Sequence, residues 1–271
     1  MKLGIFAKTF AGDRPDQVLQ AAAAAGFASV QYNMACSGIG SLPAAVPVAF
    51  AADVRAASLT CGVEIAAISA TYNMIHPDLA RRLAGRESFA AIAAKAAAMR
   101  TRVLTVCSGS CDAVDQWRHH PDNGSDAAWA SMLAEFGHLI RIAERHDVLI
   151  GVEPELANVV NGAAAARRMI DTLASDRIRI VLDPANLFEL ADDRNRVIAG
   201  AVELLADRIV MAHAKDRYAD GSFATAGKGV VDFGHFIWCL RQAGFDGSLV
   251  THGLAADEAT GVAAFLAGHL G

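Results

Sequence analysis

Long hydrophobic runs are absent from this 271-residue sequence. A membrane-spanning helix needs roughly 20 consecutive apolar residues, and no run reaches that length. Although 54% of the residues are hydrophobic, many of them are alanines, and a run such as 21–25 is typical of a helix rather than of a membrane span. The first ten residues, MKLGIFAKTF, also lack the long apolar core and the cleavage site of a signal peptide, so they predict a first strand. The expectation is a cytoplasmic protein with no membrane partner.

Clustered basic residues and paired cysteines are absent as well. The net charge is −5 and no group of Lys and Arg stands out, which argues against nucleic acid as a partner. The five cysteines are scattered and odd in number, as expected for a reduced cytosolic protein whose thiols pack as small hydrophobic groups. Cys107 and Cys111 are the one closely spaced pair, and no second pair completes a zinc site.

A third absence concerns the first strand, which runs into AKTFAGDRP rather than into a glycine-rich phosphate-binding loop. That loop is the usual sign of a doubly wound open sheet, so its absence favours a closed barrel as the arrangement of alternating strands and helices. About 250 residues are typical of such a barrel. Because there is no linker and no low-complexity tail, the sequence predicts a single domain over residues 1–271.

The sequence does contain eight strand-like segments that alternate with eight helix-like segments. Such alternation requires parallel strands joined by right-handed crossovers, and eight units close naturally into an α/β structure, the (β/α)8 TIM barrel. The predicted strands are 2–9, 27–33, 63–71, 102–107, 148–155, 178–183, 208–213 and 248–252. The predicted helices are 15–25, 47–60, 79–99, 127–146, 161–174, 195–206, 233–243 and 257–270, with Asp78 and Ser125 as N-terminal caps and Gly62 as a stop.

Four of the predicted strands end in a residue that can bind a metal. The segment 148–155, VLIGVEPE, is a buried strand that delivers Glu153 at its exit, where a carboxylate is costly unless a cation or a donor meets it. Asp183, His213 and His252 follow the last three strands, at spacings of 30, 30 and 39 residues, or about one strand-helix unit each. Because the active sites of TIM barrels lie at the carboxyl ends of the strands, these four residues are predicted to meet there.

Two carboxylates and two imidazoles suit a divalent ion such as Mn²⁺, Co²⁺, Zn²⁺ or Fe²⁺ better than Ca²⁺. The alternative is that each is a hydrogen-bonded residue of the barrel rim, since acids and histidines are common at strand ends. Gln31 and Asn33 lie at the exit of the second strand and have no assigned role, and Trp117 is either a loop anchor or a wall of the pocket. Other polar residues at strand exits are predicted to bind substrate: Asn73, His76, Glu155, Asn186, Asp216 and Lys228. For His76 the alternative is an ordinary loop residue, and for Glu155 it is a solvated loop acid.

Several motifs resemble the sugar isomerase/epimerase superfamily of xylose isomerase-like TIM barrels, over essentially the whole chain. They are GVEPE followed by ANVV, IVLDPANLF, HAKD, the GKG of the next loop and GFDGSLVTHGL. YNMIHPD and WRHHPDN resemble a subgroup described as sugar phosphate isomerase/epimerase. The superfamily places Glu, Asp, His and Glu as metal ligands at the ends of strands five to eight, which implies Glu153, Asp183 and His213 as three of them. His252 stands where the family usually has its second Glu.

The resemblance implies a metal-dependent isomerase or epimerase of a small sugar or sugar derivative, which removes a proton next to a carbonyl and forms an enediolate. Glu153 would be the base, and His252 would be the second acid/base or the fourth ligand. Lys215 would bind a substrate oxygen or stabilise the developing negative charge. The cofactor would be a divalent ion, with Mn, Co, Zn and Mg all open. Lys228 would reach a terminal hydroxyl, carboxylate or phosphate.

Three other functions stay open. A lyase or dehydratase acting on an inositol-derived or sugar-acid substrate would use the same metal and enolate chemistry. A non-catalytic sugar-binding barrel would have lost the site at His252. A phosphodiesterase of the endonuclease IV type shares this barrel but needs a larger histidine cluster, with a His where this chain has Asn186, so it is the least favoured. Barrels of this kind often pair through surface loops and helices, so a homo-oligomer is open as well.

Overall fold

The computed structural model describes residues 1–190 and 192–271. Its strands are β1 (Lys2–Phe6), β2 (Ser29–Tyr32), β3 (Glu64–Ser69), β4 (Val103–Cys107), β5 (Leu149–Glu153), β6 (Ile178–Leu182), β7 (Ile209–Ala214), β8 (Asp216–Arg217), β9 (Phe223–Ala224) and β10 (Ser248–Thr251). Its α-helices are α1 (Pro15–Ala24), α2 (Val48–Cys61), α3 (Leu79–Ala96), α4 (Asp126–His146), α5 (Ala163–Leu173), α6 (Arg194–Leu205), α7 (Phe233–Gln242) and α8 (Ala259–Leu270).

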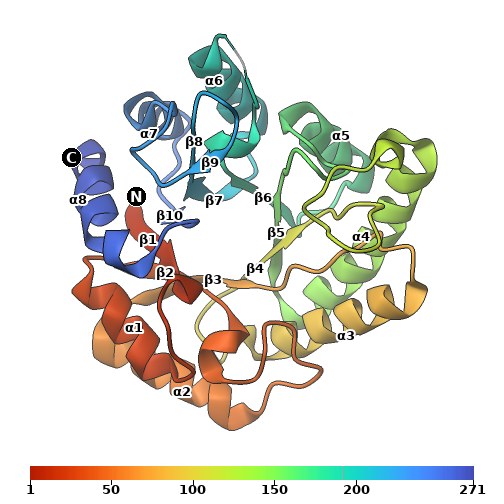
Figure 1. Cartoon of the computed structure of the whole chain (residues 1–271). Helices are drawn as coiled ribbons and strands as arrows, with labels where there is room; N and C mark the ends of the chain where they lie inside the picture. Colours follow the sequence, from red (N-terminus) through yellow and green to blue (C-terminus); the bar gives the residue numbers. More distant parts are fainter. Residues whose placement is uncertain (191) are drawn as a thin grey trace.

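Eight of these strands are parallel and close into a barrel in the order β1-β10-β7-β6-β5-β4-β3-β2. The helices form a ring around the strands (Figure 1). The predicted TIM barrel is therefore confirmed, while a single domain over 1–271 stays a prediction. Among the described residues, no helix combines the length and the apolar composition that crossing a bilayer requires.

Local sequence signals set several helix ends as predicted. Asp78 begins α3, where its side chain accepts a hydrogen bond from the backbone N–H of Ala80 at 2.8 Å. Ser125 begins α4 in the same way, through the N–H of Ala128 at 3.1 Å. Gly62 ends α2 with a φ of 66°, a left-handed conformation that glycine adopts without steric cost. The two caps and the stop are confirmed.

Most predicted elements differ from the observed bounds by one to three residues at an end, and two regions differ in the type of structure. The strand predicted over 2–9 ends at Phe6, because residues 7–9 turn into a 3-10 helix. The segment after β7, predicted as a loop, contains the antiparallel pair β8 and β9. Asp216 holds that loop in shape, since its carboxylate accepts hydrogen bonds from the backbone N–H groups of Arg217, Gly227, Gly229 and Val231.

An apolar layer inside the barrel lies directly beneath the strand exits. It includes Val181 of β6 and Met211 of β7, which are buried and lie side by side in the sheet. Side chains along a strand alternate between the barrel interior and the surrounding helices, so the residue two positions further on points inward again. Those residues are Asp183 and His213, and β10 repeats the pattern. The alternation therefore places polar side chains one layer above an apolar floor.

Gly85 in α3 lies against the ring of the buried Tyr72, and an added Cβ would overlap that ring. Gly85→Ala should therefore lower the free energy of unfolding by about 1–3 kcal/mol. Gly200 in α6 has open space around an added Cβ, so Gly200→Ala is the matched control and should gain about 1 kcal/mol at most. Urea titrations followed by circular dichroism measure both, and equal stability of the two variants would contradict the packing.

Candidate metal centre

The four residues predicted to bind a metal lie together where β5, β6, β7 and β10 end. Glu153, Asp183, His213 and His252 each offer one ligand atom, and these atoms all lie within 4.8 Å of one another. The side chains of Asp183 and His213 are buried, whereas those of Glu153 and His252 are 14% and 21% exposed. The cluster is therefore accessible from the side of Glu153 and His252.

Direct polar contacts connect the cluster. Oε1 of Glu153 lies 3.2 Å from Nδ1 of His213, and Oδ2 of Asp183 lies 3.1 Å from Nε2 of His252. The two imidazole rings are tilted, with their centroids 4.5 Å apart. Nζ of Lys215 lies 3.7 Å from Oδ2 of Asp183. Within the described part of the chain, Lys215 is the one permanent cation that forms an ion pair with either carboxylate.

Burial and charge compete over the pKa values of these groups. Burial alone would raise the pKa of Asp183, but Lys215 and the two histidines lower it to about 2. The pKa of Glu153 also falls below its usual value, because the charge and hydrogen bonding of His213 outweigh the effect of burial. Burial and the neighbouring His213 lower the pKa of His252. At neutral pH the site therefore combines two ionised carboxylates with a neutral imidazole at His252.

This donor set fits a divalent metal ion. Carboxylate oxygens and imidazole nitrogens are ligands that Zn²⁺ and similar ions take in proteins. Two ionised carboxylates buried this closely are costly unless a cation lies near both, and Lys215 balances one of the two charges. The cluster of Glu153, Asp183, His213 and His252 is therefore consistent with a divalent metal site.

A cavity of about 300 Å³ adjoins the cluster. Trp117 and Phe223, each about half exposed, contribute aromatic surface to it. Burial raises the pKa of Glu155, another residue of this cavity, to about 7. The cavity thus offers charged and aromatic side chains within one small space. The predicted site residues that line it are Glu153, Glu155, His213, Lys215 and His252.

Asn73 and His76, predicted to contact substrate, line a second cavity of about 380 Å³ instead. The side-chain amide of Asn73 donates to the carbonyl of Ser110 and accepts from its N–H, which ties the loop after β3 to the loop after β4. His76 bonds to the carbonyl of Ala113 at 2.9 Å. Thr71 lines both cavities, so the two are neighbours. Substrate contact by Asn73 and His76 stays a prediction.

Asn186, Asp216 and Lys228 also lie outside the lining of the first cavity. Asp216 is buried and binds backbone N–H groups of its own loop. Nζ of Lys228 forms an ion pair with Glu258 at 2.5 Å. Nδ2 of Asn186 donates to Oε1 of Glu153 at 2.9 Å and so contacts the cluster through that ligand. Direct substrate contact by these three residues stays a prediction.

Two residues beside the cluster received no role from the sequence. Oε1 of Gln31, on β2, lies 2.7 Å from Nε2 of His213. Phe223, on β9, contacts two cations through its ring, with Nζ of Lys215 at 3.8 Å and Cζ of Arg217 at 4.3 Å from the ring centroid. The position of Gln31 at a strand end was a usable signal. Nothing in the sequence revealed the hairpin that places Phe223.

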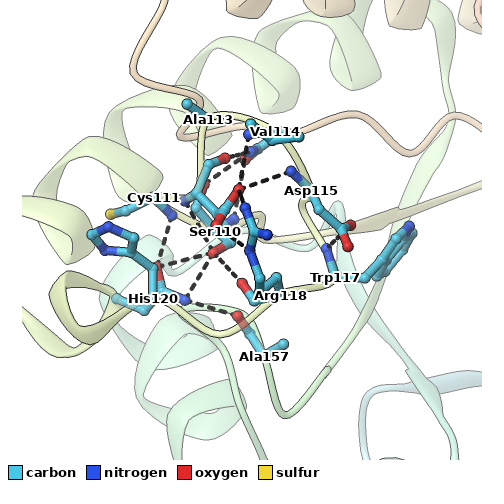
Figure 2. A network of polar contacts seen from close by, with 12 residues as sticks. Ser110, Cys111, Ala113, Val114, Asp115, Trp117, Arg118, His120 and Ala157 are labelled. Carbon is cyan, nitrogen blue, oxygen red and sulfur yellow. Dashed lines mark hydrogen bonds and ion pairs between the residues drawn. The ribbon is translucent and has the colours of Figure 1, made fainter.

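A network of polar contacts holds the long loop after β4 (Figure 2). Asp112 forms an ion pair with Arg118 at 2.6 Å and accepts the backbone N–H of Val114. The hydroxyl of Ser110 donates to the carbonyl of Arg118 at 2.8 Å. Figure 2 shows the side chain of Trp117 extending away from this network, and it lines the first cavity. Of the two roles considered for Trp117, the structure favours the pocket wall.

Comparison with known proteins identifies the family. Residues 19–264 match the model of the xylose isomerase-like TIM barrel family, and the chain belongs to this family. No curated protein sequence matches the chain. A subgroup in which His252 replaces the second glutamate stays a proposal.

Solved structures with the same fold cover nearly the whole chain. YcjR from E. coli, a 3-keto-D-glucoside 4-epimerase, has a TM-score of 0.79 and 20% identity over 99% of each chain. The IOLI protein with a bound zinc atom has a TM-score of 0.73 and 16% identity over 98% of this chain and 96% of its own. AsbF from Bacillus anthracis, a probable 3-DHS dehydratase, has a TM-score of 0.75 and 13% identity over 98% and 99%. At such identities the likeness shows the fold alone.

The raised pKa of Glu155 predicts how stability depends on pH. Burial raises this pKa, and the nearby Lys215 lowers it less, with a value of about 7 as the result. A carboxyl group with a higher pKa in the folded state destabilises that state once it ionises. The metal-free protein should therefore lose about 3 kcal/mol of stability between about pH 5 and pH 7.

Glu155→Gln removes the ionising group and should flatten this dependence. Urea titrations at several pH values, with a chelator present, measure it. Glu203→Gln, on the exposed side of α6, is the control and should keep the wild-type profile. If the Glu155→Gln profile runs parallel to that of the wild type, another group causes the loss.

Proposed function

We propose that the protein is a divalent-metal-dependent isomerase or epimerase of a small sugar or sugar derivative. The observation that carries the proposal is the cluster of Glu153, Asp183, His213 and His252, whose ligand atoms lie within 4.8 Å of one another beside a cavity. Membership of the xylose isomerase-like family and the fold shared with a 3-keto-D-glucoside 4-epimerase support sugar chemistry.

The four residues of the cluster would hold the ion. When bound, a divalent ion supplies Lewis-acid polarisation of a substrate carbonyl. Asp183 is the most firmly placed ligand, because its Oδ1 accepts the N–H of Ala185 at 2.9 Å and its Oδ2 contacts His252. Mn, Co, Zn and Mg all remain candidates. The fold shared with the zinc-containing IOLI protein supports an ion of this group.

Glu153 and His252 are the groups proposed to move protons. Both line the cavity and are the partly exposed members of the cluster, so a substrate C–H can approach them. Glu153 has a lowered pKa, is ionised at neutral pH and takes the proton from the carbon next to the carbonyl, which gives an enediolate. His252 is neutral there, so it can take up a proton at a ring nitrogen and return that proton to the substrate.

Two further features of the cavity support this chemistry. Lys215 lines it with a permanent positive charge that stabilises the negative charge of an enediolate. Trp117 and Phe223 border the same space and limit the access of water to the reacting carbon. Glu155 is proposed to bind a substrate hydroxyl.

A metal-dependent dehydratase or lyase is the second candidate. Elimination of water starts with the same proton removal at Glu153 but also needs an acid for the leaving hydroxyl. Glu155 lines the cavity and has a pKa raised to about 7 by burial, so it holds a proton near neutral pH. The fold shared with a probable 3-DHS dehydratase supports keeping this candidate.

Deuterium uptake tests the proposed reaction without knowledge of the product. Metal-free protein is loaded with Mn²⁺, Co²⁺ or Zn²⁺ and incubated in D₂O with ketoses, sugar acids and their phosphates. Deuterium at a carbon next to a carbonyl is expected, and Glu153→Gln should slow its uptake by at least about 10²-fold because the base is lost. Glu203→Gln, exposed on α6, should keep the wild-type rate.

The outcomes separate the candidates. Wild-type uptake in Glu153→Gln would show that another group is the base. Loss of water from the substrate instead of rearrangement would select the dehydratase. A wild-type protein that binds none of the divalent ions would remove the metal-dependent proposal altogether.

The replacement of the family's second glutamate by His252 predicts a double effect of its removal. His252→Ala should weaken ion binding by at least about tenfold, because a donor is lost, and should slow turnover by at least about 10²-fold. Chelator competition measures the first effect and deuterium uptake the second. His119→Ala, in the exposed loop after β4, is the control. Unchanged binding and rate in His252→Ala would show that His252 is neither ligand nor acid.

A further inference from the structure

We infer that Gln31 is a positioning residue of the metal site, which fixes His213 with its hydrogen on Nε2 and its Nδ1 directed at the carboxylates. The inference rests on the proposed binding of an ion at the cluster. Gln31 belongs to β2, which is separated from β7 by β1 and β10 around the barrel. Its contact with His213 therefore crosses the barrel interior, beneath the cavity that both residues line.

The structure places the amide nitrogen of Gln31 toward Thr105 and its amide oxygen toward the histidine. Its Nε2 donates to Oγ1 of Thr105 on β4 at 2.9 Å. Its Oε1 therefore faces His213, at 2.7 Å from Nε2. An amide oxygen can only accept a hydrogen bond, so Nε2 of His213 carries the hydrogen. Gln31 and Thr105 are buried, so water does not compete for these bonds.

The hydrogen on Nε2 decides what the other ring nitrogen of His213 can do. Nδ1 is then the ring nitrogen that can offer its electron pair to an ion. Nδ1 lies 3.2 Å from Oε1 of Glu153 and 4.0 Å from Oδ2 of Asp183. These three atoms converge, so a positive centre lies among them, either a hydrogen on Nδ1 or an ion that replaces it. Gln31 thereby keeps the site in the form that an ion requires.

The second histidine of the cluster is held differently. Nε2 of His252 lies against Asp183, and no hydrogen bond within residues 1–190 and 192–271 reaches its Nδ1. Both ring nitrogens of His213 have partners, so that ring is fixed, whereas the ring of His252 is held at one nitrogen. Gln31 therefore restrains the one imidazole of the cluster that has a partner at each ring nitrogen.

Nitrogen NMR of the metal-free protein tests the tautomer directly. His213 of the wild type should show a hydrogen on Nε2. Gln31→Leu is similar in size but offers no acceptor, so a mixture of both tautomers is expected. In titrations with Zn²⁺ or Co²⁺ alone, Gln31→Leu should bind about 10–100-fold more weakly than the wild type.

Two further variants separate positioning from packing. Gln31→Glu restores an acceptor for Nε2 and should recover the wild-type tautomer and tight ion binding. Gln20→Leu, exposed on α1, makes the same chemical change away from the site and should bind as the wild type does. Should Gln31→Leu not fold, Gln31→Asn, which withdraws the amide by one carbon, gives the same comparison.

The outcomes distinguish this inference from the proposed function. Wild-type affinity in a folded Gln31→Leu, or an Nε2 of His213 without a hydrogen in the wild type, would overturn the positioning role. Failure of Gln31→Glu to recover affinity would also count against it. If the wild type binds no ion while the tautomer responds to Gln31 as expected, the positioning role stands and the metal-dependent function fails.

Discussion

Two buried carboxylates that stay ionised are the feature on which the upper layer of this barrel depends. Glu153 and Asp183 end neighbouring strands, and burial alone would favour their neutral forms. Each instead faces an imidazole, and Lys215 adds one positive charge beside Asp183. These contacts explain why both histidines and the lysine lie where they do. The remaining negative charge is what makes the site suitable for a cation.

The strands and the loops of the barrel contribute different parts of the site. The strands supply the donors, because inward side chains recur at every second residue and the layer beneath is filled with apolar groups. The loops supply the aromatic walls, Trp117 from the segment after β4 and Phe223 from the hairpin after β7. Residues of the proposed chemistry are thus fixed by the rigid sheet, while the cavity's shape is set by the connections above it.

The sequence predicted the barrel and brought the four donors to one place because parallel strands must end on the same face. It could not predict which other polar residues face the cavity. A polar side chain at a strand exit either turns inward or bonds to the loop, and the loop conformation decides. Asn73 bonds to the loop after β4 and Asp216 to its own loop, whereas Glu155 lines the cavity. Gln31 has its role through partners on two distant strands, which no local pattern reveals.

The two aromatic walls differ in how freely they can change. The loop that carries Trp117 is held by an ion pair and hydrogen bonds among its own residues and by bonds to Asn73 and Asn158 of neighbouring loops rather than to the metal cluster. The hairpin that carries Phe223 is held by Asp216, the residue next to Lys215, and Phe223 contacts that lysine directly. Altered substrate preference can therefore evolve through the first wall without disturbing the charges of the site, whereas any change of the second also displaces a cation.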